Sequence, residues 1–338
     1  MSSYSKAEKN LHKLYLSNYF LSKSSLELEE IIHGSKAKKH PVEEYVFITG
    51  LARSGTTALM NKIFATDEYA SLQYSNMPIL LSPNLWNKKL KIAKHERAHK
   101  DGIIIDGNSP EEFDEYFWKV FLNDSYIKDG LLPHEVDEKV LKKYLTYVAL
   151  ICHSKGKKKY ISKNNNNILR LSSLAKIPEN QIIILFREPL THASSLMKLH
   201  KTFSENQKED PFVLDYFNYL GHHEFGLDHK PFLLTQDFIK NKDNYGRDDL
   251  NYWLQIWINY YEYLLDNFDD HLMVVSFEDL IEEPNKVFAY VKENLKITSL
   301  MSSDKKHVPT KYTEVSCDLK LKDRALKIYD ELSTRKGY

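Results

Sequence analysis

The sequence has few cysteines and no excess of charge of either sign. Only Cys152 and Cys317 occur in 338 residues. This argues against the disulfide framework of a secreted protein; one bridge stays open, but we expect two buried free thiols. Lysine plus arginine and aspartate plus glutamate both number 47. A net charge of zero argues against a general nucleic-acid or membrane-surface binder. Any anion must therefore bind at a local site.

Long apolar runs and flexible linkers are also missing. The first residues, MSSYSK, lack the apolar core of a signal peptide, and runs such as 182–186 are too short to span a bilayer. We therefore expect a cytoplasmic protein without a membrane span. No Gly-, Ser- or Pro-rich segment divides the chain, which predicts a single domain over residues 1–338. Its parts would be a helical extension (1–40), an α/β core (41–300) and a tail with a helix (301–338).

Short β-branched and aromatic runs alternate with helical periodicity along the chain. The predicted strands are 44–49, 102–106, 159–162, 181–186 and 272–277. Helices are predicted over 6–33 (one or two), 56–65 and 250–268. Such alternation indicates a mostly parallel sheet with helices on both faces, so the predicted fold class is α/β, a three-layer sandwich.

One further helix start is predicted at Ser109-Pro110-Glu111-Glu112. A capping serine, a proline at the first position and a glutamate at the capping-box position all favour it. The aromatic residues that follow are expected to be the buried stripe of that helix: Phe113, Phe117, Trp118 and Phe121. The tryptophans and tyrosines of 250–268 have helical spacing too, which favours core packing over stacking on a sugar.

A loop with the sequence TGLARSGTTAL, residues 49–59, follows the first predicted strand. Its two glycines have the spacing of a phosphate-binding loop, but Thr56 and Thr57 stand where a triphosphatase carries lysine and then serine or threonine. Between a strand and a helix, backbone N–H groups and the helix N-terminus form an anion site. Arg53 can reach the same anion. The missing lysine argues against transfer of a terminal phosphoryl group.

A second anion-binding feature follows the strand predicted at 181–186. Arg187 comes directly after that strand, and Ser194 and Ser195 lie on the next predicted helix. Ligands bind at the carboxyl ends of parallel strands, where an arginine can make a forked contact with a phosphate. An ion pair between Arg187 and a carboxylate such as Glu188 is the alternative. The two features together suit a ligand with two separated anionic groups.

In this order, the motifs resemble sulfotransferases that use 3′-phosphoadenosine 5′-phosphosulfate, most of all bacterial members. In that family a Lys/Arg-Ser-Gly-Thr-Thr loop holds the 5′-phosphosulfate, and a strand-end arginine with a helix serine holds the 3′-phosphate. Stretches 96–102, 162–165, 221–226 and 274–280 add to the likeness. The resemblance implies a P-loop-NTPase-like sulfotransferase fold and this donor, with no metal required. It assigns donor binding to Arg53, Ser54, Gly55, Thr56, Thr57, Arg187 and Ser195, and we include Ala58 next to the loop. Lys163, at a predicted strand end, is expected to contact the nucleotide or the transferred group; a solvated loop is the alternative.

The implied reaction is in-line sulfuryl transfer to a hydroxyl or amine. Charge grows on the leaving 5′-phosphate, and we expect Arg53 and the loop N–H groups to stabilise it. Arginine cannot donate a proton near neutral pH, so its role is electrostatic. Some relatives place a catalytic carboxylate in a zone that reads 71–76 here and has none. The general base is therefore predicted to be Glu111, or else His99; the further candidates are Asp106, Glu112 and Glu115.

Other readings stay open beside this one. His222-His223-Glu224 with His229 has no recognised zinc spacing and no cysteine nearby, so we expect no metal there. A P-loop kinase or triphosphatase would need the missing lysine, and a non-catalytic protein could retain the nucleotide site. The acceptor would be a small molecule, a glycan or a lipid. No nucleic-acid partner is expected, and the sequence does not indicate an oligomeric state.

Overall fold

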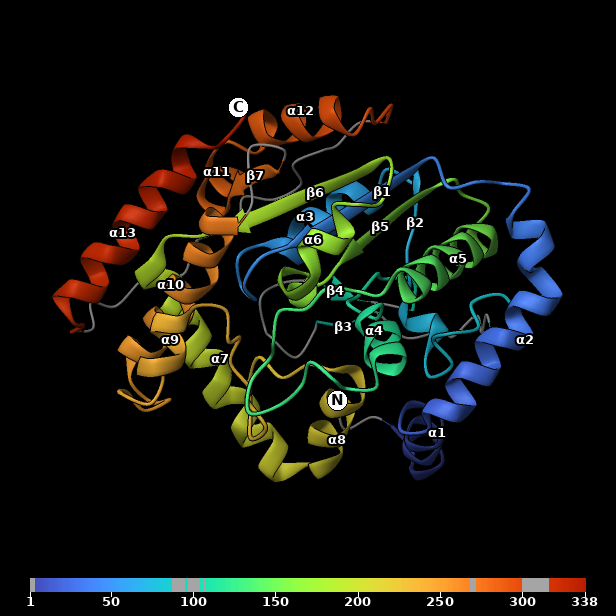
Figure 1. Cartoon of the computed structure of the whole chain (residues 1–338), viewed down its shortest axis with the longest axis horizontal. Coiled ribbons are helices and arrows are strands. Elements are labelled where there is room, and N and C mark those ends of the chain that lie inside the picture. The colour runs from blue at the N-terminus through green and yellow to red at the C-terminus, as the bar shows by residue number, and fades with distance from the viewer. Residues whose placement is uncertain (1–3, 87–94, 97–103, 106, 268–271, 300–315) are drawn as a thin grey trace.

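The computed structural model describes residues 4–86, 95–96, 104–105, 107–267, 272–299 and 316–338. A sheet of five parallel strands in the order β2-β5-β1-β6-β7 forms the centre of this part of the chain (Figure 1). The strands are β1 (Glu44–Thr49), β2 (Tyr69–Ala70), β5 (Lys159–Lys163), β6 (Asn180–Phe186) and β7 (Met273–Ser276). The predicted parallel α/β sheet is therefore confirmed.

The central strand, β1, sets which loops meet. Ile48 of β1 lies opposite Lys163 of β5 on one side and Ile183 of β6 on the other. All three strands run in the same direction, so their carboxyl ends share one edge of the sheet. That edge collects the loop after β1, the end of β5 and Arg187 after β6.

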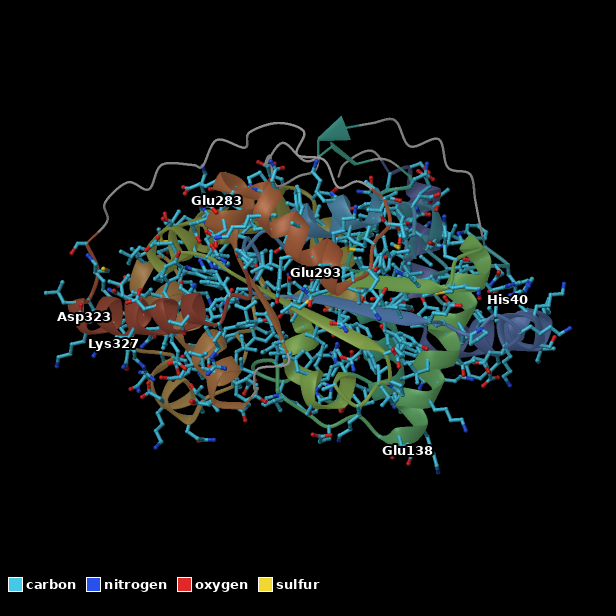
Figure 2. All side chains as sticks on the ribbon, turned by 90° about the horizontal axis from the view of Figure 1, so that it is seen from above. His40, Glu138, Glu283, Glu293, Asp323 and Lys327 are labelled. Carbon is cyan, nitrogen blue, oxygen red and sulfur yellow. The ribbon has the colours of Figure 1, made fainter. Side chains whose placement is uncertain are left out.

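Alternating side chains along β1 enter two separate cores. Val46 and Ile48 pack with α3 (Thr56–Phe64) and α12 (Pro284–Asn294), while Phe47 packs in a larger core with helices of the opposite face. Figure 2 shows α12, marked by Glu283 and Glu293, lying over the strands. The larger core includes α5 (Glu138–Lys155), α7 (Pro189–Glu209) and α10 (Leu250–Asn267). Helices on both faces complete the three layers.

The remaining helices frame this sandwich. The α-helices are α1 (Lys6–Leu16), α2 (Tyr19–Ala37), α4 (Glu115–Leu122), α6 (Leu171–Leu174), α8 (Pro211–Leu220), α9 (Gln236–Asn241), α11 (Phe277–Glu282) and α13 (Leu319–Thr334), and η1 (Tyr74–Asn76) and η2 (Asn165–Arg170) are 3₁₀-helices. The predicted N-terminal helical stretch forms two helices, of which α2 packs on α5 and α1 on α8. Helices α2 and α13 lie at opposite ends of the molecule (Figures 1 and 2). None of the described helices has the length and apolar character that crossing a membrane requires.

Two sequence predictions need correction here. The helix predicted to start at Ser109-Pro110 begins instead at Glu115, because the preceding segment is extended: Pro110 bridges to Gln73, and the amide of Ser75 donates to the carbonyl of Gly107. The strand predicted at 102–106 is described only at β4 (Ile104–Ile105). It pairs with β3 (His95–Glu96) in a separate antiparallel sheet.

Several side-chain predictions are confirmed. Phe113, Phe117 and Trp118 are buried, and Phe121 packs against the core. Most aromatic residues of α10 are buried as well. Both cysteines are free thiols as expected, although only Cys152 is buried and Cys317 is half-exposed.

Candidate active site

The loop after β1 has an unusual backbone. Gly50, Arg53 and Gly55 all have positive φ angles, of 155°, 75° and 95°. A side chain at Gly50 would come within 2.5 Å of the carbonyl oxygen of Leu185, and one at Gly55 within 2.8 Å of the Phe277 ring. The two glycines are thus required by close approach as well as by conformation. A left-handed arginine between them is strained backbone of the kind that clusters at functional sites.

The predicted anion-binding residues from distant segments meet at this loop. Arg53 Nε lies 3.4 Å from Ser195 Oγ on α7, and Arg187 Nη1 donates to the carbonyl oxygen of Arg53 over 3.4 Å. His192, on the same helix as Ser195, bonds the carbonyl of Ala52 through Nε2 at 2.8 Å. The structure therefore brings Arg53, Arg187 and Ser195 together, as the sequence predicts.

Buried donors at this junction lack partners. Among the described residues, neither Ser54 Oγ nor Arg187 Nε has a hydrogen-bond partner, although Ser54 is fully buried and Arg187 is 6% exposed. Burial lowers the pKa of Arg187; Glu278 opposes this shift and Arg53 adds to it. Unpaired buried donors are costly, so native proteins rarely leave them without a ligand or water. The unpartnered Nε of Arg187, next to the guanidinium group of Arg53, suits a phosphate group.

The first turn of α3 completes the loop. Its N-cap is Gly55, so no side chain caps the helix N-terminus. The leading N–H groups of α3 then depend on other partners, and the helix dipole favours an anion there. Thr56 and Thr57 are buried in this turn, whereas Ala58 is exposed. A glycine-containing loop that leads into an uncapped helix N-terminus is able to accept an anion.

A buried ammonium group lies at the neighbouring strand end. Lys163, the last residue of β5, is buried and forms an ion pair with Glu112 Oε2. The other oxygen of Glu112 accepts a 2.6 Å bond from the amide of Asn165. Burial raises the pKa of Glu112, whereas the Lys163 ammonium group opposes this shift and favours the charged carboxylate; the carboxylate of Glu224 adds to the rise. The sequence favours Glu111 over Glu112 as the general base, and it does not predict the ion pair of Glu112 with Lys163.

The same cluster extends to the histidine-rich stretch. Asn165 Nδ2 donates to Glu224 Oε1 over 3.0 Å, and His222 Nδ1 lies 4.0 Å from Glu224 Oε2. One ligand atom each from Glu112, His222 and Glu224 lies within 4.8 Å of the others. The sequence considered His222 with its neighbours, not with Glu112, which is far away along the chain. This set is able to hold a metal ion.

The other histidines of that stretch have separate contacts. His229 Nε2 bonds the hydroxyl of Tyr252 at 2.8 Å, and His223 Nδ1 lies 3.3 Å from Asp228. Burial lowers the pKa of His229 to about 3, so it is neutral at physiological pH. His229 packs against Tyr252 and Trp253 of α10, and neither histidine is part of the metal-capable set.

The candidate general bases differ in their burial and contacts. Glu111 is half-buried, accepts a 3.2 Å bond from Tyr74, and is close enough to Lys163 to raise its pKa. His99 and Asp106 lie outside the described residues. Glu115 is fully buried in an ion pair with Arg170 at 2.7 Å, so it is structural. Glu111 lies outside this helix, which begins only at Glu115.

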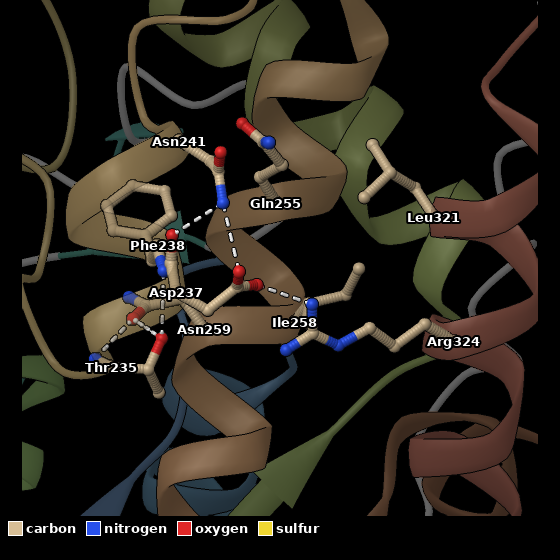
Figure 3. Close-up of a pocket in the computed structure, with 9 residues that line it drawn as sticks. All are labelled: Thr235, Asp237, Phe238, Asn241, Gln255, Ile258, Asn259, Leu321 and Arg324. Atoms are coloured by element: carbon tan, nitrogen blue, oxygen red, sulfur yellow. Dashed lines mark hydrogen bonds and ion pairs between the residues drawn. The ribbon is translucent and has the colours of Figure 1, made fainter.

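A small pocket lies away from these groups, between α9, α10 and α13 (Figure 3). Its lining residues are Thr235, Asp237, Phe238, Asn241, Gln255, Ile258, Asn259, Leu321 and Arg324. Arg324 pairs there with Asp237 at 2.5 Å and with Glu262 at 2.6 Å, which joins α13 to α9 and α10. None of the site residues predicted from the sequence lines this pocket.

A model described as the sulfotransferase family matches residues 45–225. No curated protein matches the chain significantly. Sulfotransferase STF1 from Mycobacterium tuberculosis H37Rv is similar in structure, with 11% identity and a TM-score of 0.47 over 98% of this chain and 87% of that one. Sulfotransferase STF9 from Mycobacterium avium is also similar in structure, with 11% sequence identity and a TM-score of 0.49. The match covers 99% of this chain and 79% of that one.

Proposed function

Because this chain belongs to the sulfotransferase family, we propose that it transfers a sulfuryl group from 3′-phosphoadenosine 5′-phosphosulfate to a hydroxyl or amine. One observation carries the proposal. The loop after β1 and the end of β6, far apart in sequence, are joined by the contacts of Arg53 with Ser195 and of Arg187 with the loop. A donor with a phosphosulfate at one end and a 3′-phosphate at the other needs two such anion sites side by side.

The donor would lie across this junction. Its 5′-phosphosulfate binds the loop and first turn of α3, residues 53–58, where Ser54 Oγ lacks a partner among the described residues and the helix N-terminus is uncapped by a side chain. Its 3′-phosphate binds Arg187 and Ser195, and accepts a hydrogen bond from the otherwise unpaired Nε of Arg187. This assignment covers Arg53, Ser54, Gly55, Thr56, Thr57, Ala58, Arg187 and Ser195.

Lys163 would supply the ammonium group that the loop lacks. It ends the strand next to β1, opposite Ile48, two residues before the loop begins. Its ion pair with Glu112 keeps a buried lysine charged and holds its side chain in place. Lysine at this position can meet charge on the transferring group or on the leaving phosphate, together with Arg53. Glu112 is then a positioning residue for Lys163.

Glu111 remains the proposed general base, and His99 the second candidate. Glu111 borders Lys163 and is held by the hydroxyl of Tyr74. A carboxylate beside the reacting groups can take the proton of the acceptor hydroxyl as the S–O bond forms. Replacing Glu111 by Gln is expected to lower kcat by roughly 10²–10⁴-fold, with the nucleotide affinity unchanged. Equal turnover in the Glu111→Gln protein would move the role to His99.

The direct test uses labelled donor and a panel of small alcohols, amines, glycans and lipids, read by mass for an added sulfo group. Calorimetry with 3′,5′-bisphosphoadenosine measures the donor site separately. Tight nucleotide binding without turnover on any acceptor would indicate a non-catalytic binding protein. Phosphoryl transfer from ATP would indicate a kinase. Absence of nucleotide binding would contradict the proposal itself.

A further inference from the structure

The cluster of Glu112, His222 and Glu224 differs from ordinary surface acids in its burial and convergence. Its ligand atoms lie within 4.8 Å of one another. Glu112 is 2% exposed, and the side chains of His222 and Glu224 are 18% and 11% exposed. Carboxylates are rarely withdrawn from water without a partner of opposite charge. The three residues come from a loop before α4 and a loop after α8, so the fold, not the chain order, brings them together.

Negative charge at the cluster exceeds the positive charge in contact with it. Two carboxylates, Glu112 and Glu224, lie in the set, and Glu111 is near enough to act on Lys163. Lys163 is the ammonium group paired with Glu112 among the described residues. Lys163 therefore balances one of the two carboxylates, and the ligand oxygens of Glu112 and Glu224, within 4.8 Å of each other, still repel as like charges. A bound cation would remove this repulsion.

An independent observation points to the same ligand. Asn165 is 3% exposed and turns its carboxamide toward Glu224, to which Nδ2 donates over 3.0 Å. Its Oδ1 is buried and has no hydrogen-bond partner in the described part of the chain. An amide oxygen is a good ligand for a hard cation. A buried amide oxygen that accepts no hydrogen bond is rare in native proteins. Asn165 Oδ1 is therefore an acceptor without a partner on a side chain that contacts the cluster, while the backbone amide and Nδ2 of Asn165 donate to Glu112 and Glu224.

We propose that Glu112, His222 and Glu224, with Asn165 beside them, bind one divalent cation of the Mn²⁺ or Zn²⁺ class. Two carboxylates and one imidazole form a mixed oxygen and nitrogen set. Carboxylate and amide oxygens alone would suit Mg²⁺ or Ca²⁺, and the imidazole shifts the preference to transition metals. The site lies at the edge of the sheet where β5 ends, beside Lys163. Any role of the cation on the acceptor hydroxyl rests on the proposed function; its binding does not.

The first test is calorimetry of the full chain after chelator treatment, with MnCl₂ or ZnCl₂ as the titrant. We expect one site per chain. The Glu224→Gln protein should bind at least about tenfold more weakly, since losing even an outer partner of a metal ligand costs that much. Glu135→Gln is the matched control, because this carboxylate pairs with exposed Lys176 away from the cluster. Equal affinity of the unaltered, Glu224→Gln and Glu135→Gln proteins would overturn the proposal.

A second measurement avoids dependence on a variant that fails to fold. Pulsed electron paramagnetic resonance of the unaltered protein with one equivalent of Mn²⁺ should show coupling to a directly bound imidazole nitrogen. The coupling should vanish in His222→Ala and persist in His223→Ala. Bound Mn²⁺ without nitrogen coupling would overturn the assignment. Binding of 3′,5′-bisphosphoadenosine in EDTA tests the donor site alone, so failure of the cation site and failure of the proposed function are distinguishable.

Discussion

The guanidinium carbon of Arg187 lies 4.3 Å from the centre of the Phe277 ring, while its Nη1 donates to the carbonyl oxygen of Arg53. One side chain thereby joins the end of β6, the loop after β1 and the first residue of α11. The same Phe277 ring fills the space that a side chain at Gly55 would need. The loop is held in shape by residues more than a hundred positions away, because a positively charged group stacks well on an aromatic face.

Replacing Phe277 by Leu should weaken nucleotide binding. The change keeps an apolar side chain under the loop but removes the aromatic face that holds Arg187 in place. The free energy of nucleotide binding should become less favourable by about 0.5–2 kcal/mol. Calorimetry with 3′,5′-bisphosphoadenosine measures it. Phe212→Leu is the control, since Phe212 packs similarly under Lys9, 4.9 Å from its ring centre, at a distant helix. Comparable losses in both proteins would show that the effect is general destabilisation.

Arg53→Ala should slow sulfuryl transfer by roughly 10²–10³-fold, about 3–4 kcal/mol of barrier, if its guanidinium stabilises the leaving phosphate. Arg53→Lys should retain part of the rate, because it keeps the charge and loses the forked donors. Rates with saturating donor and acceptor report this. Arg335→Ala, at an exposed pair with Glu331, serves as the control. Full turnover in Arg53→Ala would remove this residue from the mechanism.

Glu115→Gln should destabilise the fold without a specific effect on chemistry. Glu115 and Arg170 are a fully buried ion pair at 2.7 Å, and Tyr126 also donates to the carboxylate. Breaking such a pair leaves an uncompensated buried charge and costs about 3–5 kcal/mol. Urea unfolding measures the loss. Lys176→Ala, which breaks an exposed pair with Glu135, should cost at most about 1 kcal/mol. A Glu115→Gln protein of normal stability but no activity would return Glu115 to the list of bases.

Stability should decline as the pH falls below neutrality, in part through His229. Burial lowers the pKa of His229 in the folded state to about 3. The unfolded chain binds this proton near pH 6.5, so between those two values protonation favours unfolding. In this range His229 lowers the free energy of unfolding by up to about 1.4 kcal/mol for each pH unit of acidification. Denaturant unfolding from pH 7 to 4 should show a shallower slope in His229→Gln than in the unaltered protein. Parallel curves would contradict a neutral buried His229.

Much of the framework was predictable from sequence because it is local. The run 44–49 and the periodicity of 250–268 became β1 and α10 within a residue or two. Strand burial and helix amphipathicity repeat with fixed periods, so neighbouring residues carry the signal. The glycine loop and Arg187 were likewise identifiable, since each follows a strand and their meeting follows from parallel strands sharing one edge.

Other features were decided only by tertiary contacts. The capping residues at Ser109-Pro110 favour a helix, yet pairing of Pro110 with Gln73 keeps that segment extended. The cluster of Glu112 with Glu224 joins residues over a hundred positions apart, through Asn165, the first residue of η2. By itself, the sequence determined which segments fold and which loops reach the edge of the sheet, because periodicity and turn chemistry act over a few residues. Only the packed structure decided which charged side chains lose water together, since that depends on which distant segments exclude solvent from the same place.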